Sequence, residues 1–311
     1  MVELVDTYAS GAYVARRGSS SLPSSTLQIL VLIMTNPLPT IIVVCGPTAT
    51  GKSDYAVTLA REINGEVISA DSRQVYRGLD IGSGKITTRE MRGVPHHLLD
   101  IAHPRRTFSV AQFQAKGTKI IADILKRGKT PIVCGGSGFY IDALIYNQSF
   151  PKVSANTKLR TQLQKYSLIE LQQKLYALDP ARYETIDIHN SVRLIRAIEI
   201  ATVLGAVPVL TKTLRYKVQW IYLDFPDQIL KERIHTRLLK RMKSGMLKEV
   251  QHLHNAEHIS WKRLESFGLE YRYLTLYLQK KITKEEMLVK LEQAIWHYAK
   301  RQRTWFKKYA K

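Results

Sequence analysis

The chain has 311 residues, 45% of them hydrophobic, and carries 47 Lys and Arg against 26 Asp and Glu, a formal net charge of +21. This length accommodates one large domain or two smaller ones with an ample core. No apolar run of the sequence approaches the ~18 residues that a membrane-spanning helix needs, so we expect no membrane partner. The positive charge favours a polyanionic partner such as nucleic acid, although solubility or a basic proteome would also explain it.

The first 33 residues show little hydrophobic periodicity, and their two acidic and two basic side chains cancel. Ser and Arg are common in transit peptides, but Glu3 and Asp6 argue against one here. We expect residues 1–33 to be a leader outside the fold. Because Gly18–Pro23 can be back-translated into the stem and loop of a tRNA T arm, our hypothesis is a mis-assigned start, with the natural protein beginning at Met34.

The first strong pattern is a short strand followed by a glycine-rich loop. Thr40–Cys45 is apolar and rich in β-branched side chains, as in a strand buried on both faces of a parallel sheet. The next segment, GPTATGKS (Gly46–Ser53), has the G-x-x-x-x-G-K-S spacing of a loop whose backbone N–H groups hold phosphate, and the helix-compatible stretch Asp54–Ile63 follows. Lys52 then offers a positive charge to phosphoryl oxygens, and Ser53 offers a hydroxyl to Mg²⁺. The pattern predicts an anion site but does not define the chemistry.

A second strand, Glu66–Ala70, ends at Asp71-Ser72-Arg73-Gln74. Parallel pairing would bring these residues to the same edge of the sheet as the phosphate loop. The Asp71 carboxylate could bind Mg²⁺ as a Walker-B acid or act as a general base; the alternative is a cap at the end of the strand without a catalytic role. GLDIGSGK (Gly78–Lys85) follows as a flexible glycine-rich loop that ends in a cation.

The histidines are expected to be structural. His96–His97 precedes an apolar run and lacks the Cys or His-x-x-x-His partners of a zinc site. His252, His254 and His258 have a looser ligand-like spacing, but they fall on a strongly basic helical stretch. We therefore expect no zinc in this chain.

A third strand, Pro131–Cys134, follows a predicted helix over Val110–Lys126 and ends in the tight turn Gly135-Gly136-Ser137-Gly138, which opens the helix Ser137–Ile145. The turn predicts either a second anion-binding nest or the close approach of a ligand to the backbone. No acid follows this strand, so it is a poor Walker B. Cys134 and Cys45 each end a core strand and read as small core residues rather than a disulfide, which fits a reducing cytoplasm.

Strands that alternate with helices predict an α/β fold, a P-loop-type parallel sheet core with helices on both faces. The fourth strand is Gln219–Asp224. We expect residues 34–151 to form the first part of the core, residues 152–213 an all-helical insertion domain, and residues 214–311 the second part of the core with basic C-terminal helices. The final segment, Trp296–Lys311, interleaves Lys and Arg with Trp, Tyr and Phe, which suits phosphate contacts and base stacking.

Eight segments occur together in one order: GPTATGKS, ADSRQVYRGLDIGSGK, VPHHLLDI, FSVAQF, GGSGFYI, NSVRLIRAIEI, RLLKRMKSGMLKEV and YAKRQRTWF. From Thr40 to the C-terminus the chain resembles tRNA dimethylallyltransferase, the isopentenyl-tRNA transferase family, in its compact bacterial form without a C-terminal zinc finger. The resemblance implies transfer of the dimethylallyl group from dimethylallyl diphosphate to N6 of the adenine 3′-adjacent to the anticodon, position 37 of UNN-reading tRNAs, with release of diphosphate. The implied partners are dimethylallyl diphosphate and the tRNA anticodon stem-loop, the implied cofactor is Mg²⁺, and we expect a cytoplasmic monomer.

The same resemblance implies roles for individual residues. Asp71 is the general base for the adenine amine with Thr48 near it, Lys52 and Arg237 neutralise the diphosphate, and Ser53 binds Mg²⁺. The helical insertion is implied to clasp the anticodon stem. The residues implied to hold the diphosphate are Gly46, Pro47, Thr48, Ala49, Thr50, Gly51, Lys52 and Ser53. The residues implied to contact tRNA are Asp71, Ser72, Arg73, Gln74, Ser137, Val192, Arg193, Leu194, Ile195 and Arg196.

The chain departs from the family pattern in a few places. Ser53 and Ser137 stand where the family usually has Thr, and both keep the hydroxyl. The family's Gly-Tyr-x-Glu is here Gly268-Leu269-Glu270-Tyr271, and Ile295-Trp296 replaces the Thr-Arg before the terminal motif. The last two changes bear on the expected C-terminal tRNA contacts.

Three alternatives stay open at this stage. A P-loop small-molecule kinase would explain the loop and Mg²⁺ but not the Asp-Ser-Arg-Gln segment, the glycine turn or the basic aromatic tail. A prenyltransferase acting on free adenine nucleotides would have less need of the insertion and of the net charge. A non-catalytic tRNA-binding protein would not need Asp71 beside an intact phosphate loop.

Overall fold

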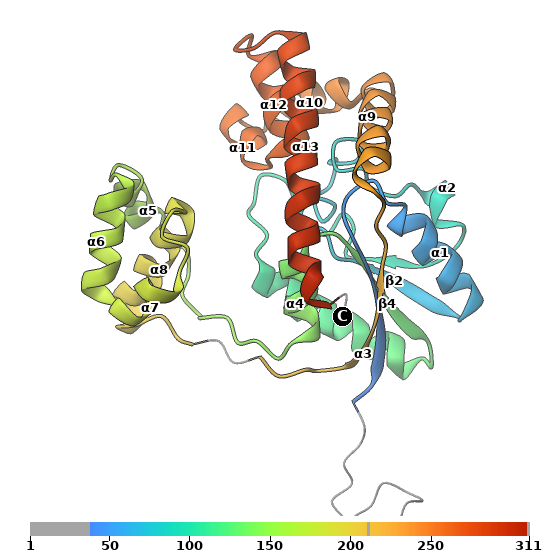
Figure 1. Cartoon of the computed structure of the whole chain (residues 1–311), viewed down its shortest axis with the longest axis horizontal. Helices are drawn as coiled ribbons and strands as arrows, with labels where there is room; N and C mark the ends of the chain where they lie inside the picture. The colour runs from blue at the N-terminus through green and yellow to red at the C-terminus, as the bar shows by residue number, and fades with distance from the viewer. Residues whose placement is uncertain (1–37, 210–211, 310–311) are drawn as a thin grey trace, which may run out of the picture. The chain divides into compact units, whose positions relative to one another are not determined.

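The computed structural model of the protein describes residues 38–209 and 212–309 (Figure 1). The leader expected over residues 1–33, and with it the question of a start at Met34, lies outside the described residues. A five-stranded sheet is present, and its strands are β1 (Thr40–Cys45), β2 (Gly65–Ser69), β3 (His96–His97), β4 (Thr130–Gly135) and β5 (Lys217–Tyr222). The helices are α1 (Lys52–Glu62), α2 (Thr88–Met91), α3 (Val110–Lys126), α4 (Gly138–Ile145), α5 (Thr157–Leu163), α6 (Leu168–Leu178), α7 (Pro180–Thr185), α8 (Ser191–Leu204), α9 (Asp227–Lys243), α10 (Met246–Asn255), α11 (Trp261–Ser266), α12 (Leu269–Leu278) and α13 (Lys284–Phe306), followed by the 3₁₀ turn η1 (Lys307–Tyr309).

The sheet is entirely parallel, with the strand order β3-β2-β4-β1-β5. The predicted α/β class is therefore confirmed, and the four predicted strands are present with ends shifted by no more than two residues. The fifth strand, β3, was not predicted. It is only His96–His97, which pairs with Val67 and Ile68 of β2, and two residues are too few to produce a periodic pattern.

Both faces of the sheet are covered, as the continuous apolar run of β1 requires. Ile41, Val43 and Cys45 belong to one hydrophobic cluster together with residues of α3 and α4. Ile42 and Val44 point to the other face, where they join a cluster that contains the buried side of α1. Alternate residues of one strand thus anchor helices on opposite faces.

The C-terminal helices α9–α13 belong to the same hydrophobic cluster as the first face of the sheet, and α13 runs from the other C-terminal helices down to α4 (Figure 1). Thr283 is the N-cap of α13. Its hydroxyl accepts from the Glu286 N–H, and the Glu286 carboxylate accepts from the Thr283 N–H. Beyond its end, Tyr309 stacks on Trp220 of β5 with 3.9 Å between ring centroids. The last turns of the chain are therefore packed against the sheet.

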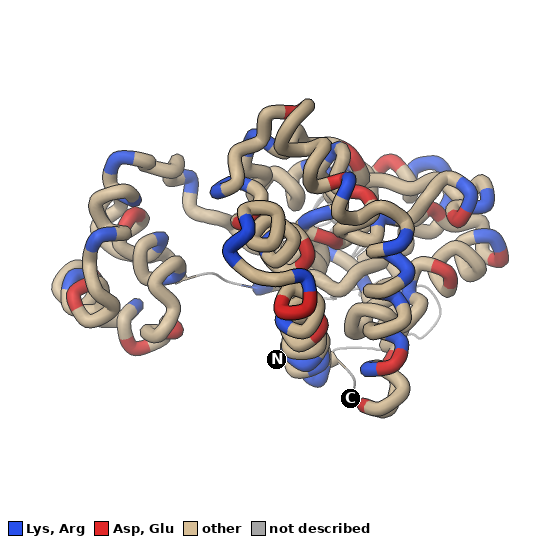
Figure 2. Tube along the Cα trace, turned by 90° about the horizontal axis from the view of Figure 1, so that it is seen from above, with Lys and Arg blue, Asp and Glu red and all other residues tan. Residues whose placement is uncertain are grey.

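Helices α5–α8 gather around their own small core, which includes Leu163, Leu171, Leu175 and Leu194. Figure 1 shows these four helices gathered in a cluster of their own. The buried Glu199 of α8 accepts from Arg160 and from the Asn156 N–H, at 2.6 Å each, and also pairs with Arg196. Although burial opposes ionisation, these hydrogen bonds lower the pKa of Glu199 to about 2. Lys and Arg positions occur both in this cluster and across the rest of the described chain (Figure 2).

A buried carboxylate with three partly exposed partners lies near the amino end of β2. The carboxylate of Glu66, which is 2% exposed, accepts from Arg127 and, at 2.8 Å, from Lys129, and His97 Nε2 lies 2.8 Å from it. Hydrogen bonding to Arg127 holds the pKa of Glu66 well below its ordinary value of 4.5. The expected structural role of His97 is thus accounted for.

Across the described residues, no helix is both long and apolar enough to cross a bilayer.

Replacing Glu66 by Gln should lower the free energy of unfolding by about 1–3 kcal/mol, because the buried position loses its charge-assisted hydrogen bonds to the partly exposed Arg127 and Lys129. Chemical denaturation at pH 7 measures the change. Since the pKa of Glu66 is depressed in the folded state, its contribution is present above pH 4.5 and is lost as the pH falls, so the gap between wild type and Glu66→Gln should narrow in acid. The control is Asp123→Asn, which removes an exposed partner of the same Arg127 and should cost less than about 1 kcal/mol. Equal losses for the two variants would contradict the assignment.

Candidate active site

A pocket of about 1210 Å³ opens at the carboxyl edge of the sheet. It brings together the phosphate loop, the segment after β2, the glycine-rich loop that follows, and residues of α9, α12 and α13. Parallel sheets gather ligand sites at this edge because the loops that follow their strands meet there. Residues from both ends of the described chain therefore line a single cavity.

The phosphate loop has the strained backbone that its glycines permit. Gly46 has φ 145°, and a Cβ there would lie 2.0 Å from the carbonyl oxygen of Leu223. Gly51 at the start of α1 has φ 84° and Ala49 has φ 66°, both left-handed. The ammonium of Lys52 donates to the Pro47 carbonyl inside the loop. Burial lowers the pKa of Lys52 to about 8, and the charge of Arg237 acts in the same direction.

Two arginines of α9 meet this loop. Arg237 Nη1 donates to Thr48 Oγ1 at 3.0 Å, and Arg233 Nε donates to the Ala49 carbonyl at 2.8 Å. Burial lowers the pKa of Arg237, and so does the neighbouring charge of Arg241. Two cations that are costly to hold unpaired, Lys52 and Arg237, thus flank one loop, an arrangement that a bound anion would stabilise.

Asp71 directly follows β2 and lines the same pocket. Its Oδ1 accepts from the backbone N–H of Arg73 at 2.7 Å and of Gln74 at 3.3 Å, so it does cap the turn. Among the described residues, Oδ2 has no hydrogen-bond partner. One carboxylate oxygen therefore fixes the turn while the other is free to accept a proton in the pocket. Burial lowers the pKa of both Lys52 and Arg237, and the charge of Asp71 opposes that lowering.

The other residues of this segment are held by the protein itself. Gln74 Oε1 accepts from the Ser69 hydroxyl at 3.0 Å, and Gln74 Nε2 donates to the Gly84 carbonyl at 3.3 Å. Arg73 Nε donates to the carbonyl of Phe267, and the Ser72 N–H donates to the Ser137 hydroxyl at 3.4 Å. Ser72 and Ser137, from two sequence motifs, are therefore adjacent.

A buried residue that the sequence reasoning missed, Gln302 of α13, joins two motifs of the site. Its Oε1 accepts from the Thr48 N–H at 2.8 Å, and its Nε2 donates to the Gly136 carbonyl at 2.9 Å. A Cβ at Gly136 would lie 2.1 Å from Gln302 Nε2, and one at Gly138 would lie 2.1 Å from the ring of Trp305. The glycines of this turn therefore leave room for side chains of α13. From the sequence we expected an anion nest or a nearby ligand at this turn, and neither expectation included this packing.

The residues expected to contact tRNA on α8 divide by burial. Val192 is 75% exposed, and Arg193 is exposed with a guanidinium nitrogen 3.4 Å from Asp187. Leu194 and Ile195 lie in the core of the α5–α8 cluster, because the helical period turns them inward. The side chains of these two residues are therefore turned away from solvent, and the Arg196 guanidinium is paired with Glu199.

The C-terminal tail is also more internal than its composition predicts. Phe306 is fully buried, and Tyr309 donates to Asp142 Oδ1 at 2.7 Å while it stacks on Trp220. Lys308 Nζ lies 3.0 Å from Asp142 Oδ2. The rings of Phe306 and Tyr309 thus pack the end of the chain's last helical segment against the sheet, and they are not available for stacking on bases.

The departures near residue 270 have a structural explanation. Glu270 lies 2.8 Å from Arg241, and the buried Tyr271 donates its hydroxyl to Glu249 at 2.8 Å. Burial raises the pKa of Tyr271 well above its ordinary value, so the hydroxyl remains a donor. Both residues are used inside the wall of the pocket.

Fold and site together define a P-loop-type α/β protein whose phosphate loop shares its pocket with a carboxylate, one oxygen of which has no hydrogen-bond partner in residues 38–209 and 212–309. A family model described as IPP transferase matches residues 74–309, more than half of the chain. The chain therefore belongs to the IPP transferase family.

Curated relatives agree with this membership. A protein named tRNA dimethylallyltransferase 2 from Treponema denticola is 45% identical over 276 residues, which cover 87% of this chain and 92% of that protein. A tRNA dimethylallyltransferase from Anoxybacillus flavithermus is 39% identical over 86% of this chain and 87% of its own length.

Solved structures share the fold. The tRNA isopentenylpyrophosphate transferase from Bacillus halodurans is 36% identical with a TM-score of 0.65, and the match covers 88% of each chain. A eukaryotic dimethylallyltransferase acting on tRNA is 26% identical with a TM-score of 0.75, and the match covers 86% of this chain and 70% of that one.

Replacing Gln302 by Leu should weaken the site, because it leaves the Thr48 N–H and the Gly136 carbonyl without partners beneath the loop. We expect the free energy of unfolding to fall by about 1–3 kcal/mol and the affinity for inorganic diphosphate to fall with it. Denaturation and isothermal titration measure the two quantities. Gln251→Leu, an exposed change on α10, serves as the control. If the two variants behave alike, the bridge has no role in holding the loop.

The lowered pKa of Lys52 predicts a pH dependence of anion binding. Below pH 8 the ammonium is charged; above pH 8 the free protein loses that charge, so affinity for inorganic diphosphate should fall by up to about tenfold per pH unit. Titrations between pH 7 and 9.5 should show a shallower fall for Lys52→Arg, which keeps its charge. The titration of diphosphate itself is common to both proteins. Equal slopes would assign the effect to another group.

Proposed function

We propose that this protein transfers the dimethylallyl group of dimethylallyl diphosphate to N6 of the adenine 3′-adjacent to the anticodon, position 37 of UNN-reading tRNAs. The observation that carries the proposal is Asp71 Oδ2, to which no other described residue donates, in the same pocket as the phosphate loop and Arg237. The names of the curated relatives and of the solved structures support the same reaction.

The diphosphate would lie in the phosphate loop between Lys52 and Arg237, with the dipole of α1 behind it. Ser53 is exposed in the first turn of α1, lines the pocket, and its hydroxyl has no partner among the described residues. Residues 38–209 and 212–309 contain no group of three or more His, Cys, Asp and Glu suited to a metal. Such a site fits Mg²⁺ held by one hydroxyl, water and the diphosphate itself. When bound, Mg²⁺ supplies further neutralisation of the leaving group.

The reaction breaks the C1–O bond of the allylic diphosphate and forms a bond from C1 to the adenine N6. Lys52 and Arg237 offset the charge that gathers on the departing diphosphate, which is the electrostatic contribution of the site. The N6 amine is a weak nucleophile and must lose a proton, which Asp71 Oδ2 accepts. Thr48, held by Arg237 and by Gln302, stands where it can orient the diphosphate oxygens.

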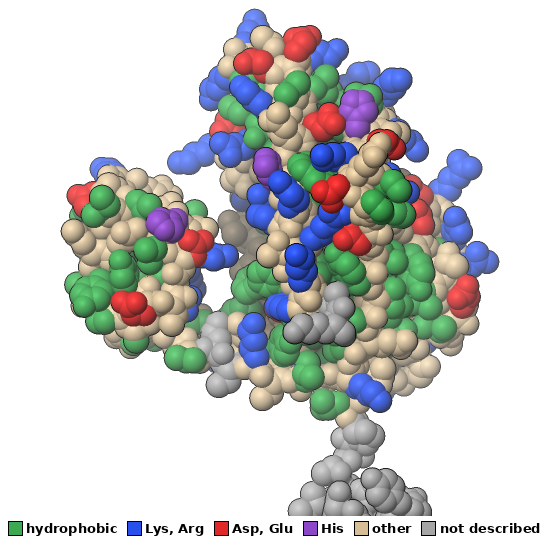
Figure 3. Space-filling view, in the orientation of Figure 1, with side chains coloured by type: hydrophobic (Ala, Val, Ile, Leu, Met, Phe, Trp, Pro, Cys, Tyr) green, Lys and Arg blue, Asp and Glu red, His purple; other side chains and the backbone are tan. Residues whose placement is uncertain are grey.

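Adenine must leave the anticodon loop to enter the pocket, as base-modifying enzymes require. Ser72 and Ser137 lie together on the Asp71 side, where they could hydrogen-bond an extruded base. Lys and Arg side chains follow α13 down the middle of the surface in Figure 3, and exposed cations rim the pocket, in keeping with phosphate contacts. These rim residues are Lys240, Arg272, Lys290 and Arg301.

The helices α5–α8 would clasp the anticodon stem. Among residues 192–196 of α8, Val192 and Arg193 have exposed side chains. We further propose that the protein acts as a monomer in the cytosol, where tRNA is present and where two buried free thiols, Cys45 and Cys134, would stay reduced.

The decisive experiment supplies dimethylallyl diphosphate, Mg²⁺ and unmodified tRNA, with AMP as a competing acceptor and labelled ATP in a parallel reaction. Prenylation of tRNA at the adenine is the expected result. Modified AMP with unmodified tRNA would favour the free-nucleotide prenyltransferase, and transfer of phosphate from ATP would favour the kinase. Folded protein that binds tRNA but transfers nothing would reject catalysis altogether.

Asp71→Asn should reduce turnover by several orders of magnitude while leaving tRNA affinity within about twofold, because the amide keeps the cap on the turn but cannot accept a proton. Single-turnover prenyl transfer and a tRNA binding assay measure the two effects. Asp54→Asn, which changes an exposed carboxylate on the first turn of α1, tests whether loss of any nearby negative charge has the same effect. Near-normal turnover in Asp71→Asn would remove Asp71 as the base.

A further inference from the structure

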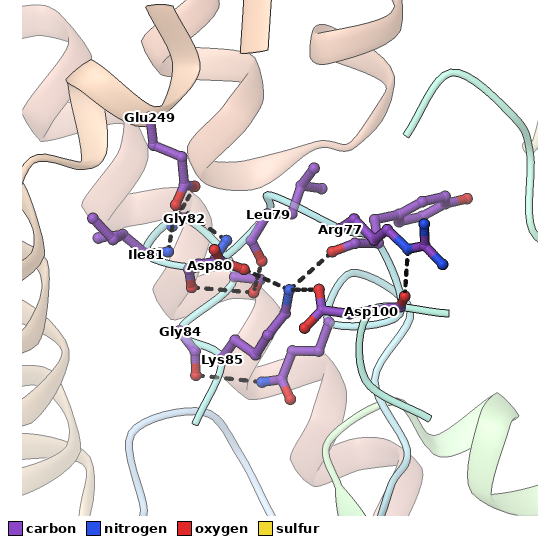
Figure 4. Close-up of polar contacts among 12 residues, drawn as sticks. Arg77, Leu79, Asp80, Ile81, Gly82, Gly84, Lys85, Asp100 and Glu249 are labelled. Atoms are coloured by element: carbon purple, nitrogen blue, oxygen red, sulfur yellow. Dashed lines mark hydrogen bonds and ion pairs between the residues drawn. The ribbon is translucent and has the colours of Figure 1, made fainter. Parts of the chain in front are cut away.

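Residues Asp80–Gly84, here called the 80–84 loop, form one wall of the pocket, and a carboxylate from outside the loop holds their backbone (Figure 4). Glu249 of α10 accepts from three consecutive N–H groups, those of Asp80 at 3.1 Å, Ile81 at 2.6 Å and Gly82 at 2.9 Å. The Tyr271 hydroxyl donates to the same carboxylate at 2.8 Å. Four donors thus converge on one anionic group, and such charge-assisted bonds are stronger than neutral ones.

The carbonyl groups of the loop are used as well. The Ile81 carbonyl accepts from Arg241 Nε at 2.6 Å, and the Gly82 carbonyl accepts from the same guanidinium. The Gly84 carbonyl accepts from Gln74 Nε2, the residue three positions after the proposed base. With its N–H groups on Glu249 and its carbonyls on Arg241 and Gln74, the loop has one defined position.

That position decides where Arg237 lies. Gly84 has φ 62°, and a Cβ on it would be 2.1 Å from Arg237 Nη2, so the guanidinium rests directly on the loop backbone. The same guanidinium reaches Thr48 Oγ1 at 3.0 Å. A shift of the 80–84 loop would therefore either displace Arg237 from the phosphate loop or release it from its support.

We propose that Glu249 is a positioning residue, which fixes the 80–84 loop so that Arg237 is held against the phosphate loop. Glu249 lines no part of the pocket, and its carboxylate is committed to the loop and to Tyr271. Its effect on the leaving group is therefore exerted through Arg237. The inference rests on the proposed function for its kinetic consequence, but anion binding tests it independently.

Glu249→Gln is the sharpest change, since it keeps the size of the side chain. The carboxamide oxygen can still accept, but its NH₂ group faces backbone donors that need an acceptor, so the 80–84 loop is released. Should that variant fail to fold, Tyr271→Phe removes a single donor to Glu249 and keeps the buried ring, and the same effect is expected at smaller size. Glu232→Gln, an exposed change on α9 one residue from Arg233, is the matched control.

The experiment is a double-mutant cycle on binding of inorganic diphosphate to the full chain, with Arg237→Gln as the second change. Glu249→Gln alone should weaken binding about tenfold, and Glu232→Gln should not. In the Arg237→Gln background, Glu249→Gln should change affinity by less than about twofold, because the group through which it acts is gone. Unchanged binding in the single variant, or a full tenfold loss in both backgrounds, would overturn the proposal.

Prenyl transfer by the same proteins separates the two hypotheses. If wild type modifies tRNA, Glu249→Gln should raise KM for dimethylallyl diphosphate with tRNA affinity unchanged; an equal loss of tRNA affinity would indicate general damage and reject a positioning role. If wild type transfers nothing, the proposed function fails, and the diphosphate cycle still decides the role of Glu249.

Discussion

The two hydrogen bonds of Gln302 are the contact on which the rest of the site depends. One amide, buried on α13, accepts from the Thr48 N–H and donates to the Gly136 carbonyl, so it fixes the loops that follow β1 and β4 relative to each other. A buried amide left without partners would cost more than the bonds contribute, so the arrangement is all or none. The last long helix is for this reason part of the active site and not an appendage to it.

Close packing against the C-terminal helices also explains why several positions in the loops of the pocket are glycine. At Gly136 and Gly138 the space that a Cβ would fill is taken by side chains of α13, and at Gly82 and Gly84 it is taken by Tyr271 and Arg237. The glycine-rich segments GGSG and GLDIGSGK are thus surfaces on which the C-terminal helices rest. Gly46 and Gly135 meet backbone instead: a Cβ at Gly46 would lie 2.0 Å from the carbonyl oxygen of Leu223, and one at Gly135 would lie 2.3 Å from that of Ala70.

The fold was largely predictable from the sequence, and the site only in part. β-branched runs predict the long strands, and the spacing of GPTATGKS predicts the phosphate loop, because both patterns lie within one element. Gln302 and Glu249 could not be predicted in this way, because they are polar residues on helices and their partners are distant in the sequence. Gln302 lies 254 residues from Thr48, and Glu249 lies 169 residues from Asp80. The helical period of α8 could have shown that Leu194 and Ile195 turn inward. β3 is too short for any local pattern to reveal it.

The distribution of charge in the pocket follows from the same packing. Burial lowers the pKa of both Lys52 and Arg237, and two buried cations beside one loop make the empty site less stable than a neutral one would be. Two carboxylates in this region are committed to other partners: Glu249 to the 80–84 loop, and Glu270 to Arg241. Asp71 differs because its turn uses only one of its two oxygens. The phosphate loop and Arg237 therefore keep their positive charge for the departing diphosphate, while Asp71 Oδ2, which lacks a hydrogen-bond partner within the described part of the chain, can take a proton. That separation is what transfer of an allylic group to an amine requires, because the departing diphosphate gains negative charge while the amine must lose a proton.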